Sequence, residues 1–225
     1  STDKTSEIID LWNNKLPIKR IHNQKNIGIY DSLIQGVSNC AGEFIFRLDH
    51  DDVWRKDHVE VILNMYKKNH NVSLYATKAI YVDKDKKFLK ESQTLNDKNI
   101  RKILLWDNPL VQSSIAFVKK DFLKVFKKTN MYSLEDYNLW IKLLKLGKLK
   151  FSSEPTLWYY VYENSLSRQN IERNYKERYL CQLKAIRSFF IDYPFRSILI
   201  LFIVVLRLCF LYLKKFLKNL IISQL

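Results

Sequence analysis

The sequence predicts an α/β fold with a mostly parallel sheet flanked by helices. Apolar runs of strand length, rich in β-branched and aromatic residues, alternate along the chain with longer segments of helical periodicity. Hydrophobic residues make up 47% and aromatic residues 14% of the 225 residues, which is enough for a sizeable core. Gly and Pro, with four of each, are too scarce to form a flexible linker.

The predicted elements follow from apolar spacing and from stop signals such as Gly147. Helices are expected over residues 3–14, 29–39, 56–69, 97–106, 119–126, 134–146 and 170–190. Strands are expected over residues 18–21, 44–48, 72–82, 111–118, 149–151 and 156–162, with one more short strand after the charged turn at 83–87.

The most informative stretch is EFIFRLDHDD, residues 43–52, a short apolar strand that ends in carboxylates. Asp49, Asp51 and Asp52 repel one another, and the only nearby cations in the sequence are Arg47 and Arg55. A divalent cation is the simplest relief, because hard cations prefer oxygen ligands and because ligands of open α/β sheets bind at the carboxyl ends of strands. The alternative is an ordinary turn or a helix cap. The Asp-x-Asp-Asp pattern favours the functional interpretation.

The C-terminal run SILILFIVVLRLCFLYL, residues 197–213, is apolar except for Arg207, and basic residues flank it. It is short for a membrane-spanning helix, so that an in-plane or a tilted helix fits as well as a span. A buried core helix is the alternative. The flanking lysines and arginines favour a membrane-associated tail and place the rest of the chain at the cytoplasmic face of the cell membrane.

The net charge of +15 predicts an anionic partner, such as phosphorylated small molecules, acidic lipid headgroups or nucleic acid. Nucleic acid ranks low, because the lysines are dispersed and no nucleic-acid-binding motif is recognisable. The three cysteines have no metal-type spacing and are expected to be reduced thiols.

A second acidic pair, Glu135-Asp136, lies in the first turn of a predicted helix. Its ordinary interpretation is structural, because Ser133 and Asp136 have the spacing of a capping box. On local evidence alone, this interpretation outweighs a catalytic one.

The order and spacing of several motifs resemble glycosyltransferase family 2, inverting enzymes of the GT-A fold, over residues 1 to about 167. The motifs are Asn26-Ile27-Gly28, Gly42-Glu43-Phe44-Ile45, the acid turn Asp49-His50-Asp51-Asp52, NPLVQSSIAFVKKDFL (residues 108–123), Ser133-Leu134-Glu135-Asp136 and Asn164-Ser165-Leu166-Ser167. The resemblance implies a partial catalytic domain at 1–167. The helical periodicity and the apolar run after it predict a helical connector at 168–196 and a membrane-associated tail at 197–225.

The resemblance also implies residue roles. Asp49 and Asn26 would bind a nucleotide-sugar donor, and Asp51 would bind Mg²⁺ or Mn²⁺ at its diphosphate. Asp136 would be the general base that deprotonates an acceptor hydroxyl. Glu135 and Trp140 would lie on the acceptor side, although the helical spacing of Trp140 from Asp136 is more often that of a core residue.

Three departures accompany this resemblance. Tyr160 and Tyr162 stand where many relatives carry an Arg and a His, and Ile34 stands where relatives often have Asn. Ser1-Thr2-Asp3 resembles the end of the family's Asp-Asp-Gly-Ser-Thr-Asp turn, so that the first βαβ unit is expected to lie upstream of Ser1.

The leading hypothesis is therefore a metal-dependent, inverting glycosyltransferase of cell-surface polysaccharide synthesis that acts on a saccharide or lipid-linked acceptor. The alternative is a truncated, inactive paralogue that serves at most as a membrane-bound scaffold. A nucleic-acid-binding module is the third hypothesis.

Overall fold

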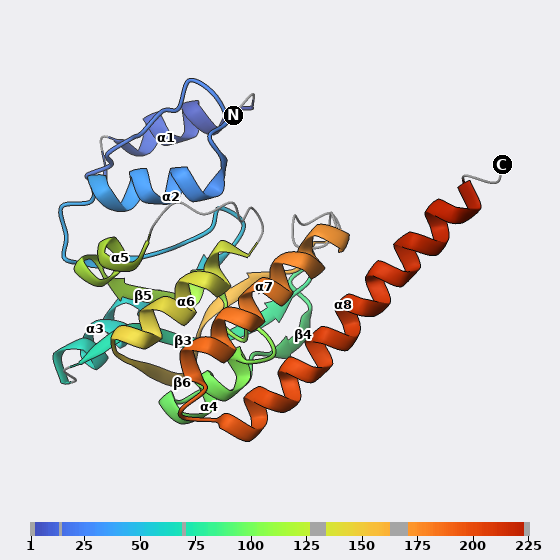
Figure 1. The fold of residues 1–225 in the computed structure, drawn as a ribbon. Helices are drawn as coiled ribbons and strands as arrows, with labels where there is room; N and C mark the ends of the chain where they lie inside the picture. Colours follow the sequence, from blue (N-terminus) through green and yellow to red (C-terminus); the bar gives the residue numbers. More distant parts are fainter. Residues whose placement is uncertain (1–2, 14, 69–70, 127–133, 163–170, 223–225) are drawn as a thin grey trace. The chain divides into compact units, whose positions relative to one another are not determined.

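The computed structural model describes residues 3–13, 15–68, 71–126, 134–162 and 171–222 (Figure 1). The chain divides into two compact units, Ser1–Asn39 and Cys40–Leu225. The first unit contains α1 (Thr5–Asn13) and α2 (Gly28–Asn39), which confirms both predicted helices. The strand predicted over 18–21 is wrong: these residues form no strand, and Lys19 and Arg20 are exposed. Apolar residues at 18 and 21 do not suffice, because a strand is stable only when another strand pairs with it.

The second unit is built on a six-stranded sheet in the order β1-β5-β3-β6-β2, with β4 paired to β3. The strands are β1 (Phe44–Phe46), β2 (Val53–Trp54), β3 (Val72–Val82), β4 (Phe88–Glu91), β5 (Ile115–Val118) and β6 (Lys148–Tyr160). The sheet is mixed. Among the described strands β3 and β6 pair in parallel, whereas β1–β5, β2–β6, β3–β4 and β3–β5 pair antiparallel.

The expectation of a mostly parallel sheet is therefore wrong. The alternation of strands and helices predicts an α/β fold correctly, but it does not fix strand direction. The turn at 83–87 returns β4 antiparallel to β3. Strand β5 enters between β1 and β3 against the direction of both.

Most helix ends in the second unit lie within about two residues of the predicted ends. The helices are α3 (His58–Lys68), α4 (Asp97–Leu104), α5 (Lys119–Val125), α6 (Glu135–Leu146), α7 (Ile171–Phe189) and α8 (Pro194–Ile222). The predicted strand 111–118 divides into a 3₁₀ turn, η1 (Gln112–Ser114), and β5. The strands predicted on either side of Pro155 are one strand, because shifts in the β3–β6 register accommodate the proline.

Both faces of β3 are covered. Tyr75 packs with Ile62 of α3 in one core cluster. By the alternation of side chains along a strand, Leu74 and Ala76 point to the opposite face, and both are fully buried. A strand buried on both faces needs apolar residues at successive positions, which is why residues 74–76 read as a continuous apolar run.

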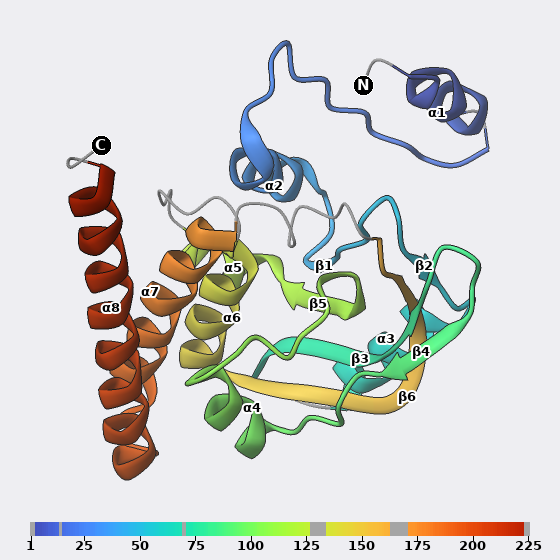
Figure 2. The same cartoon turned by 90° about the vertical axis from the view of Figure 1, so that its right-hand side faces the viewer.

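Beyond that face the helices lie in successive layers, with α6 against the sheet, α7 on α6, and α8 on α7 (Figures 1 and 2). Helix α6 is enclosed almost all round, with eight of its 12 residues buried, including Trp140 at 0% exposure. A helix this enclosed holds its first turn in a fixed place, and that first turn carries Glu135 and Asp136.

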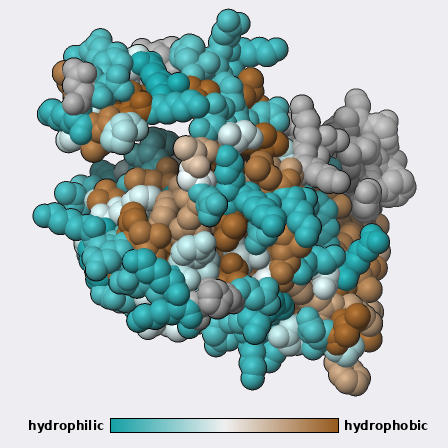
Figure 3. All heavy atoms as spheres, turned by 90° about the vertical axis from the view of Figure 1, so that its left-hand side faces the viewer, coloured by the Kyte–Doolittle hydropathy of each residue, from teal (hydrophilic) through white to brown (hydrophobic). Residues whose placement is uncertain are grey.

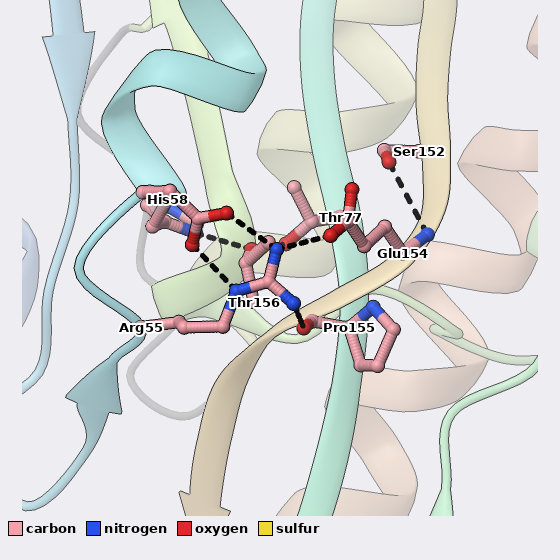
Figure 4. A network of polar contacts seen from close by, with 8 residues as sticks. Arg55, His58, Thr77, Ser152, Glu154, Pro155 and Thr156 are labelled. Atoms are coloured by element: carbon pink, nitrogen blue, oxygen red, sulfur yellow. Dashed lines mark hydrogen bonds and ion pairs between the residues drawn. The ribbon is translucent and has the colours of Figure 1, made fainter.

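A polar network ties α3 to the two central strands (Figure 4). The His58 Nδ1 atom lies 2.6 Å from the Thr156 hydroxyl, which in turn lies 2.7 Å from the Thr77 hydroxyl. Arg55 reaches the Pro155 carbonyl at 3.1 Å. His58 is 1% exposed, and burial lowers its pKa from 6.5 to about 4. The imidazole is therefore neutral in the folded protein at neutral pH.

We expect His58 to make the protein acid-sensitive. Between pH 6.5 and 4 the unfolded chain protonates this imidazole and the folded chain does not, so that the stability contribution falls as the pH falls. The loss approaches about 3 kcal/mol. In His58→Gln, urea unfolding should lose this part of the pH dependence. His22→Gln, which changes an exposed histidine, is the control and should titrate like the wild type. If the unfolding free energy of His58→Gln fell with pH as steeply as that of the wild type, the expectation would be contradicted.

Candidate active site

The acid turn lies between β1 and β2, where the chain reverses through residues 49–52. The Asp52 N–H donates to the Asp49 carbonyl at 3.2 Å and closes the turn. Asp52 is buried, and its carboxylate accepts the Tyr160 N–H at 3.2 Å. Burial raises the pKa of Asp52 to about 6, although hydrogen bonds from Ser113 and Tyr160 oppose the shift. Asp52 is thus a structural acid that ties the turn to β6.

Asp49 and Asp51 are half-buried and lie on either side of the exposed His50. Asp49 accepts from Arg47 Nε at 3.2 Å. The negative charges of Asp51 and Asp49 both contribute to the raised pKa of Asp52. The turn is therefore electronegative, and a cation bound there would relieve its charge.

Asp136 and Glu135 enter the site from the first turn of α6. Asp136 Oδ2 accepts from Asn108 Nδ2 at 2.8 Å, and its Oδ1 accepts the Tyr137 N–H at 2.6 Å. The pKa of Asp136 is raised, first by burial and then by the charge of Glu135. A carboxylate with a raised pKa accepts a proton more readily than an exposed one, which is what a general base requires.

One segment, residues 108–114, joins the two acidic groups. Asn108 donates to Asp136, and Gln112 Nε2 donates to Glu135 Oε1 at 3.1 Å. The Ser113 hydroxyl accepts the Asp49 N–H at 3.0 Å. The 108–114 segment therefore positions carboxylates that are almost 90 residues apart in the sequence.

The pKa of Tyr159 on β6 also indicates that the two acidic motifs lie near each other. Burial raises the pKa of its hydroxyl, and the charges of Asp52, Asp51, Asp49 and Asp136 raise it further. All four carboxylates thus act on one phenol. The two acidic motifs lie within electrostatic range of a common point.

The structure brings together four of the six predicted site residues: Asp49, Asp51, Glu135 and Asp136. Trp140 of α6 is fully buried, as expected for a core residue and not for a residue on the acceptor side. Asn26 belongs to the first unit, where its side chain accepts the Gly28 N–H at 2.8 Å and Gly28 adopts φ +82°, a conformation that favours glycine. The predicted Ser133 cap and the motif at 164–167 lie outside the described residues.

Sequence reasoning missed the supporting residues Asn108, Gln112, Ser113 and Tyr159. The first three lie in the NPLVQSS segment, which the resemblance singled out without assigning roles. A run of polar residues just before an apolar strand was the available signal. Tyr159 has no sequence signal beyond its place in a strand.

Across the part of the chain that the structure describes, no three His, Cys, Asp or Glu side chains are grouped so as to hold a metal ion. The carboxylate oxygens of the electronegative acid turn nevertheless fit a hard cation such as Mg²⁺.

This fold and this pair of acidic motifs define a GT-A-like α/β protein. The sequence profile described as glycosyl transferase family 2 matches residues 1–126, and the chain belongs to this family. The matched region includes the acid turn and ends before Glu135.

Two bacterial relatives are similar in sequence. One is the Escherichia coli UDP-Gal:alpha-D-GlcNAc-diphosphoundecaprenol beta-1,3-galactosyltransferase, 31% identical over 149 residues, which are 65% of this chain and 54% of that protein. The other is the Erwinia amylovora amylovoran biosynthesis glycosyltransferase AmsE, 25% identical over 136 residues, 60% of this chain and 51% of that protein. The chain thus spans about half the length of these relatives.

Two solved structures share the fold. The crystal structure of Staphylococcus aureus TarS 1-349 superposes with a TM-score of 0.59 at 15% identity, over 84% of this chain and 60% of that one. The mannosyltransferase PcManGT from Pyrobaculum calidifontis, in complex with GDP-Man and Mn²⁺, gives 0.55 at 12% identity, over 92% and 69%. Both confirm the GT-A-like fold.

We expect Ser113→Ala to loosen the acid turn. It leaves the Asp49 N–H without its acceptor and removes a hydrogen bond that lowers the pKa of Asp52. The variant should lose about 1–3 kcal/mol of unfolding free energy, and Asp52 should titrate above pH 6. Urea unfolding and carboxyl ¹³C NMR titration measure the two effects.

Ser114→Ala is the matched control, because this buried neighbour donates instead to the Val111 carbonyl at 2.7 Å. It should cost stability without moving the Asp52 titration. Equal Asp52 pKa values in both variants would show that Ser113 does not support the turn.

Proposed function

We propose that the protein transfers a sugar from a nucleotide-diphosphate sugar to a hydroxyl of a saccharide or lipid-linked acceptor, with inversion, in cell-surface polysaccharide synthesis. The family supports glycosyl transfer as the reaction class. The names of the relatives, which include a lipid-diphosphate acceptor and an exopolysaccharide, support the acceptor class.

The observation that carries the proposal is the junction of two acidic groups through the 108–114 segment. One group, Asp49 and Asp51, belongs to an electronegative turn suited to a cation and a diphosphate. The other, Asp136, has a raised pKa suited to proton abstraction. Inverting transfer needs this pair of functions on opposite sides of one sugar, one for the leaving group and one for the nucleophile.

In the proposed site Asp51, with Asp49 beside it, would hold Mg²⁺ or Mn²⁺. The bound ion would neutralise the charge that builds on the leaving nucleoside diphosphate. The solved PcManGT complex with GDP-Man and Mn²⁺ supports this choice of ion. Asp49 would also contact the donor.

Asp136 would take the proton from the acceptor hydroxyl as that oxygen attacks the anomeric carbon. The Asn108 amide holds one carboxylate oxygen, and the other accepts the Tyr137 N–H, so that the orientation of the base is fixed. Glu135 is buried against Gln112 and would shape the acceptor side of the base.

We also propose that α8 lies in the plane of a phospholipid bilayer, at the cytoplasmic face of the cell membrane. No helix within the described residues has both the length and the apolar character needed to cross a bilayer. The inward stripe of α8 is Ser197, Ile200 and Val204. Arg207 is exposed, and its guanidinium lies 4.6 Å from the Trp106 ring centroid.

The outward face of α8 is apolar. Phe195, Phe202 and Phe210 are 88%, 61% and 67% exposed, and six further exposed apolar residues accompany them: Ile198, Leu199, Leu201, Val205, Leu206 and Leu213. So large an apolar face marks an interaction site. The exposed Arg187 and Arg196 lie near the start of this helix, and they complement anionic headgroups. On the face drawn in Figure 3, hydrophobic residues are interspersed with hydrophilic ones.

Asp51→Asn and Asp136→Asn should separate the two proposed roles. Asp51→Asn should abolish metal-dependent binding of UDP or GDP in calorimetry. Asp136→Asn should keep that binding and lower nucleoside-diphosphate release, assayed with a panel of nucleotide sugars and acceptors, by about 100-fold or more. Asp85→Asn, in an exposed turn, is the control.

Normal turnover by Asp136→Asn would reduce this residue to a structural acid. Absence of nucleotide binding and of transfer from every donor tried would favour the inactive scaffold. Steeply salt-dependent nucleic-acid binding that survives removal of residues 196–225 would favour the third hypothesis.

Phe202→Asp should weaken binding to vesicles of phosphatidylglycerol and phosphatidylethanolamine about tenfold in flotation assays. The change removes one aromatic side chain that the bilayer would bury. The matched control is Phe88→Asp on β4, because Phe88 is 60% exposed and Phe202 is 61%. Vesicle binding that Phe202→Asp leaves unchanged would contradict the in-plane helix. Self-association of the protein without lipid would assign the apolar face to a second copy instead.

A further inference from the structure

Arg47 lies at the end of β1 with a side chain that is only 10% exposed. Its Nε lies 3.2 Å from Asp49 Oδ1, and its Nη2 lies 4.0 Å from Glu135 Oε1. Its Nη1 is buried and has no hydrogen-bond partner among the described residues. One guanidinium thus stands between the acid turn and the first turn of α6.

A buried guanidinium is costly. Removing it from water is offset only by well-placed partners, and one of its nitrogens has none. The ion pair with Glu135 is also long for a direct contact. A cation is therefore expected to be kept at this place for the carboxylates beside it, Asp49 and Glu135.

The charges around Asp136 indicate how Arg47 affects the ionisation of that carboxyl group. On α6, Glu135 opposes ionisation of Asp136, and burial acts in the same direction. Arg47 is the positive charge that lowers the pKa of Asp136. The other titratable groups that feel the Asp136 charge are Tyr137 on α6, Tyr159 on β6 and Cys181 on α7.

Arg178 and Lys184 are further cations on α7, but they are engaged elsewhere. Arg178 Nη1 donates to Asp107 at 2.8 Å, and Lys184 Nζ donates to Asn138 at 3.0 Å. Arg47 links a charge on the acid turn, that of Asp49, to Glu135 in the first turn of the helix that carries Asp136.

We propose that Arg47 is a positioning residue that joins the acid turn to the first turn of α6 and supplies the positive charge against which Asp136 ionises. The inference rests on the proposed function, in which Asp136 is the base and Asp49 faces the donor. Arg47 makes the geometry of the donor side and the ionisation of the base interdependent.

The test needs no knowledge of the sugar. The Asp136 carboxyl carbon is titrated by ¹³C NMR in aspartate-labelled protein and assigned by its absence in Asp136→Asn. In Arg47→Gln the titration midpoint should move to higher pH, because the favourable charge is lost and burial and Glu135 remain. Arg47→Lys keeps a charge without the planar fork, so that the midpoint should move less.

Arg55→Gln is the matched control, because Arg55 is another arginine of the second unit and is paired instead with Asp57 and Glu154. It should leave the Asp136 midpoint unchanged. If Arg47→Gln does not fold, the Asp136 midpoint of Arg47→Lys is compared with that of Glu135→Gln. The midpoint should rise in Arg47→Lys and fall in Glu135→Gln, because the second change removes a negative charge. An Asp136 midpoint that is the same in every Arg47 variant that folds overturns the proposal.

Activity separates this proposal from the one it rests on. With an active donor, the acidic limb of the kcat/KM profile should move to higher pH in Arg47→Gln, about tenfold in rate for each pH unit below the limb. An unmoved limb, together with an inactive Asp136→Asn, would remove the role of Arg47 and leave the proposed function intact. Full activity of Asp136→Asn would instead remove the base itself.

Discussion

Five buried or half-buried carboxylates lie near one another, those of Asp49, Asp51, Asp52, Glu135 and Asp136, and the surrounding contacts of the second unit compensate for their repulsion. Negative charges this close repel strongly in a low-dielectric setting. The fold offsets the repulsion with the amide donors of Asn108 and Gln112 and with the guanidinium of Arg47. Burial first, and then the charges of Asp51 and Asp49, raise the pKa of Asp52 to about 6.

The donors are themselves held by structure further out. Helix α7 anchors the residues just before the 108–114 segment, since Arg178 reaches Asp107 and Gln182 Nε2 donates to the Trp106 carbonyl at 2.5 Å. The Tyr137 hydroxyl donates to the Leu104 carbonyl at 2.6 Å and fixes α6 to the end of α4. Such an outer layer of contacts restricts the freedom of the groups that would meet the substrate.

Helix α8 combines an inward stripe and an outward apolar face on one element. The contact with Trp106 accounts for the charge in the middle of the apolar run, because the guanidinium of the exposed Arg207 lies over that ring. The same run of residues was compatible with a spanning helix, an in-plane helix and a core helix. Its packing on α7 shows that the helix is covered on one side only.

By itself, the sequence determined the class of fold, most of the elements and the two acidic motifs. These depend on local periodicity and on residue type, and both are visible in the chain. Only the tertiary structure decided strand direction, the structural role of Asp52 and the part played by Asn108, Gln112 and Ser113. Pairing direction and hydrogen bonds between distant segments depend on which surfaces meet in the folded chain. For that reason no window of sequence could show that Arg47 stands between Asp49 and Glu135.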